Sequence, residues 1–397
     1  MKPKLSAKDS QGLRGIQRTA HTGWSLDDWV LLHYSIYGGN DRSRSATELW
    51  LQVVTEGARL AEDVRRGRIT KAFDDDLVDL FRWLCAFVAK YLHQPRLNAR
   101  DPIRSLRDEG QGAARLPGPE SFAKWILQKY PRVCCACGRR QCACSSHRGL
   151  FEGRREKQHG AGEARLLDRG TALRQEALKA YARSKRRRER FYRLPLDKVI
   201  DMFAFIYGGG HEGVDLWQIA AHLLEEIGEV ADELAFLSEL HELKRLMKQA
   251  RPPVKFSDVV DKAFRLEGGL KELEKEADRM REGGEDKIID RLRAKSIQAL
   301  RGELADVLSW VSAMVYKIRT IMQEVRADHG ERYLFTDRLG NRYRRNGAFV
   351  CFACGAVPCE NDCRAVWYVR KVLDDRKQEL RSQKRVTAAG SRKSRHG

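Results

Sequence analysis

Two segments of this chain resemble each other, and this similarity constrains the fold more than any local pattern. One segment reads SIYGGNDRSRSATELW near residue 37, and the other reads FIYGGGHEGVDLW near residue 207. Each is followed by two apolar stretches that carry carboxylates at helical spacing, and each half then ends in a cysteine cluster. Self-similarity on this scale is typical of repeated structural units. We therefore expect two copies of one fold within the 397 residues.

The composition favours helices in both copies. Hydrophobic residues make up 42% of the sequence, charged residues make up 33%, and only ten prolines are present. Alternating strand patterns are scarce, so we predict an all-α protein built of two tandem helical bundles, each followed by a small cysteine-rich zinc element. The expected segments are a basic N-terminal extension (1–27), a first repeat with its cysteine cluster (28–148), a basic linker or helix (149–194), a second repeat with its cysteine cluster (195–365) that holds a long insertion (243–300), and a basic C-terminal helix and tail (366–397).

Paired carboxylates mark a candidate metal site in the second copy. Glu226 and Glu229 lie three residues apart in LLEEIGEVADEL, as do Glu303 and Asp306 in GELADVLSW. That spacing places each pair on one face of a helix, and the apolar neighbours indicate a face that packs towards a core. Four acidic groups brought together would repel one another, and Mg²⁺ or Mn²⁺ would relieve the repulsion. The alternative is two ordinary solvated helix faces.

The first copy lacks part of this pattern. Glu56, Asp76 and Asp79 match three of the four acidic positions, but Arg59 stands where the second copy has Glu229. A positive charge at a ligand position would weaken cation binding. We expect a degenerate copy that serves as a scaffold, with a pseudo-dimer partner or a weak nucleotide site as the alternatives.

Both cysteine clusters follow the pattern C-x-x-C-G-x-x-x-C with one further cysteine. Four thiolates at such spacing suit a tetrahedral structural Zn²⁺. A redox disulfide or a turn without metal is the alternative, and the basic residues beside each cluster leave nucleic-acid contact open. The expected zinc ligands are Cys134, Cys137, Cys142 and Cys144 in the first cluster and Cys351, Cys354, Cys359 and Cys363 in the second.

The net charge of +20 favours a polyanionic partner such as a nucleotide or a nucleic acid. The excess is concentrated in residues 182–193 and 376–396. These runs predict either a solvated linker and tail or a nucleic-acid contact. The N-terminus has no apolar signal core and no stretch reaches membrane-spanning length, so we expect a cytoplasmic protein without membrane contact.

The two acidic motifs together resemble those of the MazG-like nucleotide pyrophosphohydrolases, within the all-α NTP pyrophosphatase superfamily. The family pattern E-E-x-x-E followed by E-x-x-D maps onto Glu225, Glu226, Glu229, Glu303 and Asp306. The similarity covers residues 195–365 and, more faintly, 28–147. It implies Mg²⁺-dependent hydrolysis of a (deoxy)nucleoside triphosphate to a monophosphate and pyrophosphate, by dimers or tetramers. The long insertion between the acidic motifs departs from the family.

Further roles follow from position along these helices. Glu225 is a candidate general base, although it also fits an ordinary surface glutamate. Lys317 lies about three turns after Asp306 on the expected helix and is a candidate phosphate contact, with a surface lysine as the alternative. We expect the side chains of Trp217 and Trp310 to pack in the core, or alternatively to stack on a base. The rival function is a regulatory or nucleic-acid-binding zinc protein that senses nucleotides without turning them over.

Overall fold

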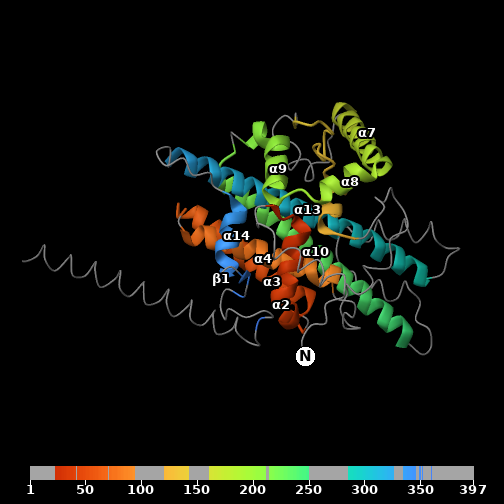
Figure 1. The fold of residues 1–397 in the computed structure, drawn as a ribbon. Helices are drawn as coiled ribbons and strands as arrows, with labels where there is room; N and C mark the ends of the chain where they lie inside the picture. The colour runs from red at the N-terminus through yellow and green to blue at the C-terminus, as the bar shows by residue number, and fades with distance from the viewer. Residues whose placement is uncertain are drawn as a thin grey trace, which may run out of the picture.

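The computed structural model of the chain is mostly helical, as the sequence predicts (Figure 1). Its described residues form ten helices and one short hairpin. None of these helices combines the length and the apolar character needed to cross a membrane. The structure describes residues 23–41, 43–69, 71–93, 120–142, 161–211, 214–249, 285–325, 334–345, 348–349, 351 and 359.

The helices of the first half are α2 (Leu26–Asp41), α3 (Ala46–Arg65), α4 (Lys71–His93) and α5 (Phe122–Lys129). Two basic helices follow, α7 (Ala161–Arg183) and α8 (Lys185–Tyr192). The second half contains α9 (Leu196–His211), α10 (Leu216–Gln249), α13 (Glu285–Val325) and α14 (Phe335–Tyr343), then the antiparallel strands β1 (Arg344–Arg345) and β2 (Ala348–Phe349).

Serine caps start several of these helices where the sequence provides them. Ser45 begins α3 with a capping box, in which its side chain and that of Glu48 satisfy each other's backbone N–H groups. Ser121 and Ser184 accept hydrogen bonds at the starts of α5 and α8 in the same way. The start of α8 directly after Ser184 turns part of the basic run at 182–193 into a separate short helix.

The two longest helices, α10 and α13, pack along each other, and α3 packs on α10. Both long helices reach into the expected insertion at 243–300, because α10 continues to Gln249 and α13 begins at Glu285. The rest of that insertion lies outside the described residues. The second acidic motif therefore sits in the middle of a 41-residue helix, which fixes it firmly against α10.

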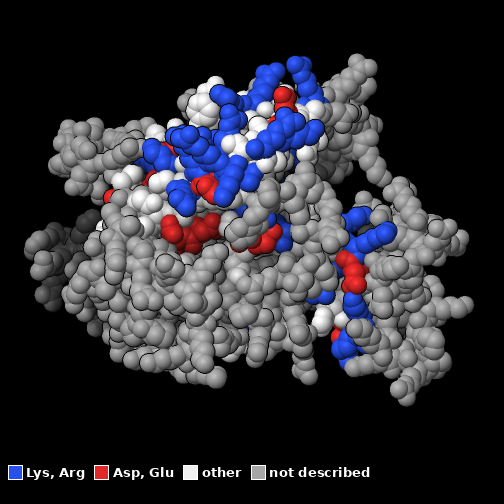
Figure 2. Space-filling view, turned by 45° about the vertical axis from the view of Figure 1, so that its right-hand side comes forward, with Lys and Arg blue, Asp and Glu red and all other residues white. Residues whose placement is uncertain are grey.

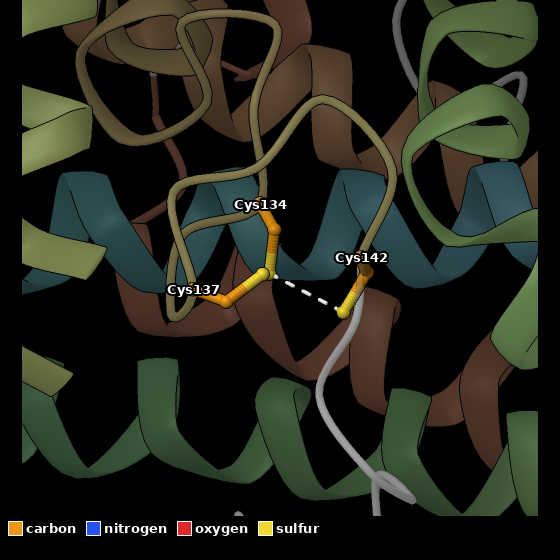
Figure 3. Close-up of side chains that lie close together, drawn as sticks. All are labelled: Cys134, Cys137 and Cys142. Atoms are coloured by element: carbon orange, nitrogen blue, oxygen red, sulfur yellow. Dashed lines mark hydrogen bonds between the residues drawn. The ribbon is translucent and has the colours of Figure 1, made fainter. Parts of the chain in front are cut away.

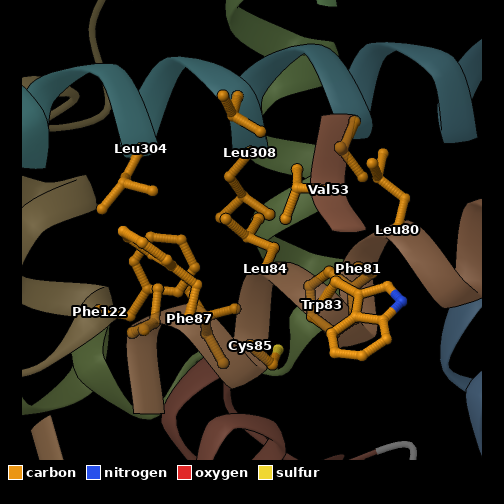
Figure 4. Packing of buried hydrophobic residues seen from close by; sticks show 14 of the residues in the cluster. Val53, Leu80, Phe81, Trp83, Leu84, Cys85, Phe87, Phe122, Leu304 and Leu308 are labelled. Carbon is orange, nitrogen blue, oxygen red and sulfur yellow. The ribbon is translucent and has the colours of Figure 1, made fainter. Parts of the chain in front are cut away.

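One hydrophobic core joins the two halves (Figure 4). In this view Leu304 and Leu308 of α13 face Leu84 and Phe87 of α4, and all four are fully or almost fully buried. Burying a side chain of this size contributes about 1.5–3 kcal/mol. Because the core is shared, the two halves stabilise each other and are not independent domains.

The two halves approach each other closely at the crossing of α3 and α10. The Trp50 indole donates a hydrogen bond of 3.0 Å to the backbone oxygen of Ile227. A Cβ atom added at Gly57 would lie 2.7 Å from the Ile227 Cδ1 atom. Glycine at position 57 therefore leaves room for the Ile227 side chain, which would have to shift if a larger residue stood there.

The short helices α5 and α14 make matching contacts at their N-termini. The Asp27 carboxylate accepts a hydrogen bond of 2.8 Å from the Phe122 N–H, and Asp197 accepts one of 3.1 Å from the Phe335 N–H. Each carboxylate lies at the start of the first helix of the same half. Each short helix is thus anchored at its beginning to its own half, where an acidic side chain at a helix N-terminus is stabilising.

The same two helices then end on the opposite half. The last residue of α5 reaches Asp306 on α13, and Arg342 of α14 reaches Asp79 on α4. The cysteine segments behind them cross in the same way, because the Cys142 N–H donates to Ile206 O at 2.7 Å. The Cys359 N–H likewise donates to Ile36 O at 2.6 Å. Each half therefore supplies side chains to the acidic group of the other.

Candidate metal centre

Three carboxylates of the second half converge between α10 and α13. Oxygen atoms of Glu226, Glu229 and Glu303 all lie within 4.8 Å of one another, and Glu226 is buried while the other two are partly buried. The i, i+3 spacing on α10 brings Glu226 and Glu229 to one face, and the packing of α13 supplies Glu303. The structure brings these three predicted residues together.

Asp306, the fourth predicted ligand, is held by two residues from the first half. The Lys129 ammonium forms an ion pair with Asp306, and the Tyr130 hydroxyl donates a hydrogen bond to it. The Lys129 Nζ atom also lies 3.7 Å from a Glu303 oxygen. Sequence reasoning missed both residues. The signal available was the basic residue followed by tyrosine before each cysteine cluster, Lys129-Tyr130 and Arg342-Tyr343.

The electrostatics of this group favour a bound cation. Burial raises the pKa of Glu226 to about 9, and the nearby charges of Asp306, Glu229 and Glu303 add to the effect. Burial also raises the pKa of Glu303 to about 7, against the opposing charge of Lys129. The pKa of Asp306 is raised by burial as well. Lys129 alone does not compensate the negative charge, which a divalent cation would do.

Two buried oxygens of the group accept no hydrogen bond in the described structure, which tests whether the residues fit a metal. Glu226 Oε2 and Glu303 Oε2 are buried and accept no hydrogen bond within the described part of the chain. Such atoms are costly unless they coordinate a ligand. The other Glu226 oxygen accepts a hydrogen bond of 3.4 Å from the Trp310 indole. A donor set of carboxylate oxygens with open lone pairs fits Mg²⁺ or Mn²⁺.

Two of the corresponding carboxylates of the first half, Glu56 and Asp79, pair with arginines. Glu56 pairs with Arg59 at 3.0 Å, so the arginine that replaces a ligand also neutralises a neighbouring one. Arg342 lies 3.2 Å from Asp79 and 3.5 Å from Asp75. Arginine thus neutralises two of the three carboxylates that the sequence predicts to be a remnant of the acidic site.

Glu225 and Lys317, the two candidate catalytic residues, are not among the clustered carboxylates and their direct contacts described above. Glu225 is exposed, and its carboxylate contacts His222 Nδ1 at 3.2 Å instead of joining the three-carboxylate group. Lys317 is partly buried on α13. Trp310 is buried and stacks on His222 at 4.7 Å between ring centroids, whereas Trp217 is 47% exposed.

Three of the four predicted ligands of the first cysteine cluster lie together (Figure 3). The sulfur atoms of Cys134, Cys137 and Cys142 are all within 4.8 Å, and those of Cys134 and Cys142 are 3.5 Å apart. The turn closes through a 3.0 Å hydrogen bond from the Gly138 N–H to Cys134 O, and Gly138 has a φ of 66° that favours glycine. Thiolates so placed fit Zn²⁺. Cys144 lies outside the described residues.

The second cysteine cluster is described only at two positions. Cys351 and Cys359 are both buried, while Cys354 and Cys363 lie outside the described residues. Cys135, the additional cysteine of the first cluster, contacts the Tyr207 hydroxyl at 3.6 Å.

No family model, curated protein or solved structure matches this chain.

Proposed function

We propose that this protein is a Mg²⁺- or Mn²⁺-dependent nucleoside triphosphate pyrophosphohydrolase of the MazG-like kind, which converts a (d)NTP and water into a (d)NMP and pyrophosphate. The observation that carries the proposal is the convergence of Glu226, Glu229 and Glu303, with two buried oxygens that accept no hydrogen bond in the described structure. Asp306 adjoins them and completes the acidic motif pair.

The four carboxylates would hold the cation. When bound, the cation would neutralise phosphate charge and lower the pKa of an attacking water. Trp310 fixes Glu226 through its indole N–H, and the stacking of His222 on Trp310 fixes that indole in turn. The rigid placement of α10 against α13 then sets the spacing between the two acidic motifs.

Lys129 supplies a positive charge from the other half of the molecule. Its ammonium group lies between Asp306 and Glu303 in this structure. A flexible lysine can turn from a carboxylate to a phosphate oxygen when another cation neutralises the carboxylates. In this proposal the first copy is a pseudo-dimer partner as well as a scaffold, because α5 delivers Lys129 and Tyr130 to the site.

The zinc elements belong to the same proposal. Cys134, Cys137 and Cys142, with Cys144, would hold one structural Zn²⁺, and Cys351, Cys354, Cys359 and Cys363 would hold a second. The crossed backbone bonds at Cys142 and Cys359 support a stapling role, because each cluster is tied to a helix of the opposite half. Metal analysis of the purified chain should find about two zinc equivalents, and less than about one equivalent would contradict both sites.

Pyrophosphate release from a panel of NTPs and dNTPs, with Mg²⁺ or Mn²⁺, tests the enzymatic proposal. We expect Glu303→Gln and Asp306→Asn to lower the rate at least about 100-fold, the scale for losing one preorganised electrostatic group. Glu56→Gln in the first half is the matched control and should keep the rate. Absence of pyrophosphate with every nucleotide would refute the activity, and full activity in Glu303→Gln would refute the site.

The rival function is nucleotide sensing without turnover. The ion pair between Lys129 and Asp306 favours it, because a cationic group already neutralises one of the ligands. Calorimetry with a nucleotide and Mg²⁺ distinguishes the two functions when it is combined with the pyrophosphate assay. Tight binding without release of pyrophosphate would favour the sensor.

A further inference from the structure

A basic cavity lies away from the carboxylates, between α7, α8, α9 and the start of the first cysteine loop. Its volume is about 670 Å³, and none of the four acidic motif residues lines it. Five basic residues line it: Arg132, Arg140, Arg187, Arg190 and Lys198. Cavities of this size usually accommodate a small ligand or one unit of a larger one.

The positive charge of this cavity is not compensated by its lining. Asp201 is its one acidic lining residue, and Asp201 is already held by Arg319 at 2.7 Å and by Lys198 at 3.2 Å. The four arginines of the lining take part in no ion pair within the described residues. The cavity therefore presents several guanidinium groups ready to bind an anion, and arginine suits phosphate oxygens especially well.

The local fold explains why these arginines face the cavity. Arg188 donates a hydrogen bond of 2.9 Å to the Tyr181 backbone oxygen and so ties α8 to the end of α7. Arg187 and Arg190, three residues apart on α8, then lie on one face and line the cavity. On the opposite wall, Arg132 precedes the clustered cysteines and Arg140 lies between Cys137 and Cys142. The cysteine turn thus positions two of the guanidinium groups.

Aromatic side chains complete the lining. Phe205 on α9 is 56% exposed at the edge of the cavity, which is unusual for so large an apolar side chain. Tyr181 lies opposite on α7, close enough to Arg132, Arg187 and Arg140 for their charges to act on its hydroxyl. An exposed aromatic ring beside guanidinium groups is suited to stacking on a nucleobase whose phosphates the arginines bind.

The positive surface continues beyond the cavity. Figure 2 shows Lys and Arg side chains gathered over α7 and α8 on this face. Lys185, Arg186 and Arg193 are exposed next to the lining residues of α8. A single nucleotide would leave this surface unused, whereas a strand of linked nucleotides would cover it.

We propose that this cavity and the surface of α7 and α8 bind single-stranded nucleic acid, with one base against Phe205 and the adjacent phosphates on Arg132, Arg140, Arg187 and Arg190. This binding is independent of the carboxylate site. It assigns the basic run at 182–193 to a defined surface on the first cysteine loop and α9. A duplex cannot present an unstacked base to Phe205, so single strands are preferred.

Fluorescence anisotropy of the full-length protein with labelled 15-nucleotide single strands, across a range of salt concentrations, tests the proposal. Arg187→Glu/Arg190→Glu should weaken binding at least about tenfold and reduce the salt slope by about 2, because each lost phosphate contact removes about one released counterion. Phe205→Ala should weaken binding about fivefold or more, with an unchanged salt slope, since one stacked base contributes about 1–3 kcal/mol.

Controls separate this surface from the other basic segments of the chain. Arg65→Glu/Arg66→Glu at the end of α3 makes the same charge change far from the cavity in sequence and should bind like the wild type. Melting curves by circular dichroism must show that each variant is folded. Equal affinity for duplex and single strands, full binding by Phe205→Ala, or equal affinity for a mononucleotide and the 15-nucleotide strand would each overturn the proposal.

Discussion

The two halves of the molecule carry carboxylates at matching positions but balance their charge differently. In the second half, Glu226, Glu229 and Glu303 face one another and receive one ammonium group, from Lys129. In the first half, Arg59 pairs with Glu56 and Arg342 pairs with Asp79. The difference depends on two pairs of positions. On the acidic helices, Glu229 corresponds to Arg59, and on the short helices that cross between the halves, Lys129 corresponds to Arg342. We therefore propose that charge balance, and not the helical framework, determines which half can bind a cation.

The chemistry of the basic residues reinforces this difference. Arginine stays charged and forms planar, forked contacts with carboxylates, so Arg342 reaches both Asp75 and Asp79. Lysine is a point charge on a flexible stem, and it yields its place to a cation more readily. The second half thus combines excess negative charge with a displaceable counterion. In the first half the counterions are arginines, which are held in place by their forked contacts.

The largest effect should come from making the second half like the first. Glu229→Arg places a guanidinium group among Glu226, Glu303 and Asp306, so we expect pyrophosphate release to fall at least about 1,000-fold, more than the loss of one electrostatic group alone. Stabilisation by the cation should also disappear. In the wild type that stabilisation is about 2.7 kcal/mol when the Mg²⁺ concentration is 100 times its Kd.

Thermal melts with and without Mg²⁺ measure the second part of this prediction without relying on turnover. Arg59→Glu is the reciprocal change and should leave the Mg²⁺-dependent activity in place. A Glu229→Arg protein that still gains stability from Mg²⁺ would show that the cation binds elsewhere.

The second prediction compares the two crossing basic residues. Lys129→Met leaves four carboxylates without their counterion, and we expect it to lower the free energy of unfolding of the metal-free protein by roughly 1–3 kcal/mol, less than for a fully buried pair because the side chain is 21% exposed. Saturating Mg²⁺ should restore most of that loss. Arg342→Met should cost a similar amount that Mg²⁺ does not restore.

Urea denaturation of both variants, with and without Mg²⁺, measures this contrast. Equal rescue of the two variants by Mg²⁺ would mean that both carboxylate groups bind the cation. No rescue of either would mean that Lys129 has a purely structural role.

Local spacing explains how much of this site could be predicted from the sequence. Glu226, Glu229, Glu303 and Asp306 follow an i, i+3 rule on helices, so their shared faces are encoded within a few residues. Lys129 lies 177 residues from Asp306, and Arg342 lies 263 residues from Asp79. Their places depend on how α5 and α14 dock across the halves, which no local pattern specifies.

The same reasoning accounts for the residues whose roles shift in the structure. Glu225 directly precedes a ligand in the sequence, but one residue is about 100° of rotation on a helix, and its side chain turns outwards to His222. The sequence shows the positive charge of the basic run at 182–193 but not which residues surround it. Its relation to Phe205 and Arg132 depends on the packing of α8 beside α9 and the cysteine loop.

The third prediction concerns pH. Burial raises the pKa of Glu226 to about 9, from an ordinary value of 4.5 in the unfolded chain. The folded state therefore keeps this proton while the unfolded chain loses it, and the contribution of Glu226 to stability is full below pH 4.5 and declines up to about pH 9. Glu226→Gln should flatten this part of the pH profile in metal-free buffer.

Chemical denaturation at several pH values between 5 and 9 measures that profile. Glu225→Gln is the matched control, because this exposed carboxylate lies next to Glu226 in the sequence and outside the cluster. Apparent Mg²⁺ affinity should rise over the same interval, since the cation competes with the proton. An identical slope in Glu226→Gln and the wild type would contradict a neutral, buried Glu226.

The smallest effect should come from the anchors of the two crossing helices. Asp27→Ala removes the carboxylate that accepts the Phe122 N–H and should lower stability by about 0.5–2 kcal/mol, the usual range for a lost helix cap. Asp197→Ala should cost somewhat more, because Asp197 also accepts from Thr336 and lies 3.8 Å from Arg319.

The loss of activity should be larger for Asp27→Ala than for Asp197→Ala, which is the opposite of the order expected for stability. This contrast distinguishes the roles of the two halves. Loosening α5 displaces Lys129 from the carboxylates of the second half, so Asp27→Ala should reduce pyrophosphate release severalfold at saturating Mg²⁺. Loosening α14 mainly disturbs the arginine-paired carboxylates of the first half, and Arg319 keeps its closer contact with Asp201, so Asp197→Ala should leave release nearly unchanged despite its greater cost in stability. Paired measurements of melting temperature and rate on the two variants decide the matter. An activity loss that simply tracks stability would mean that the crossed helices only hold the two halves together.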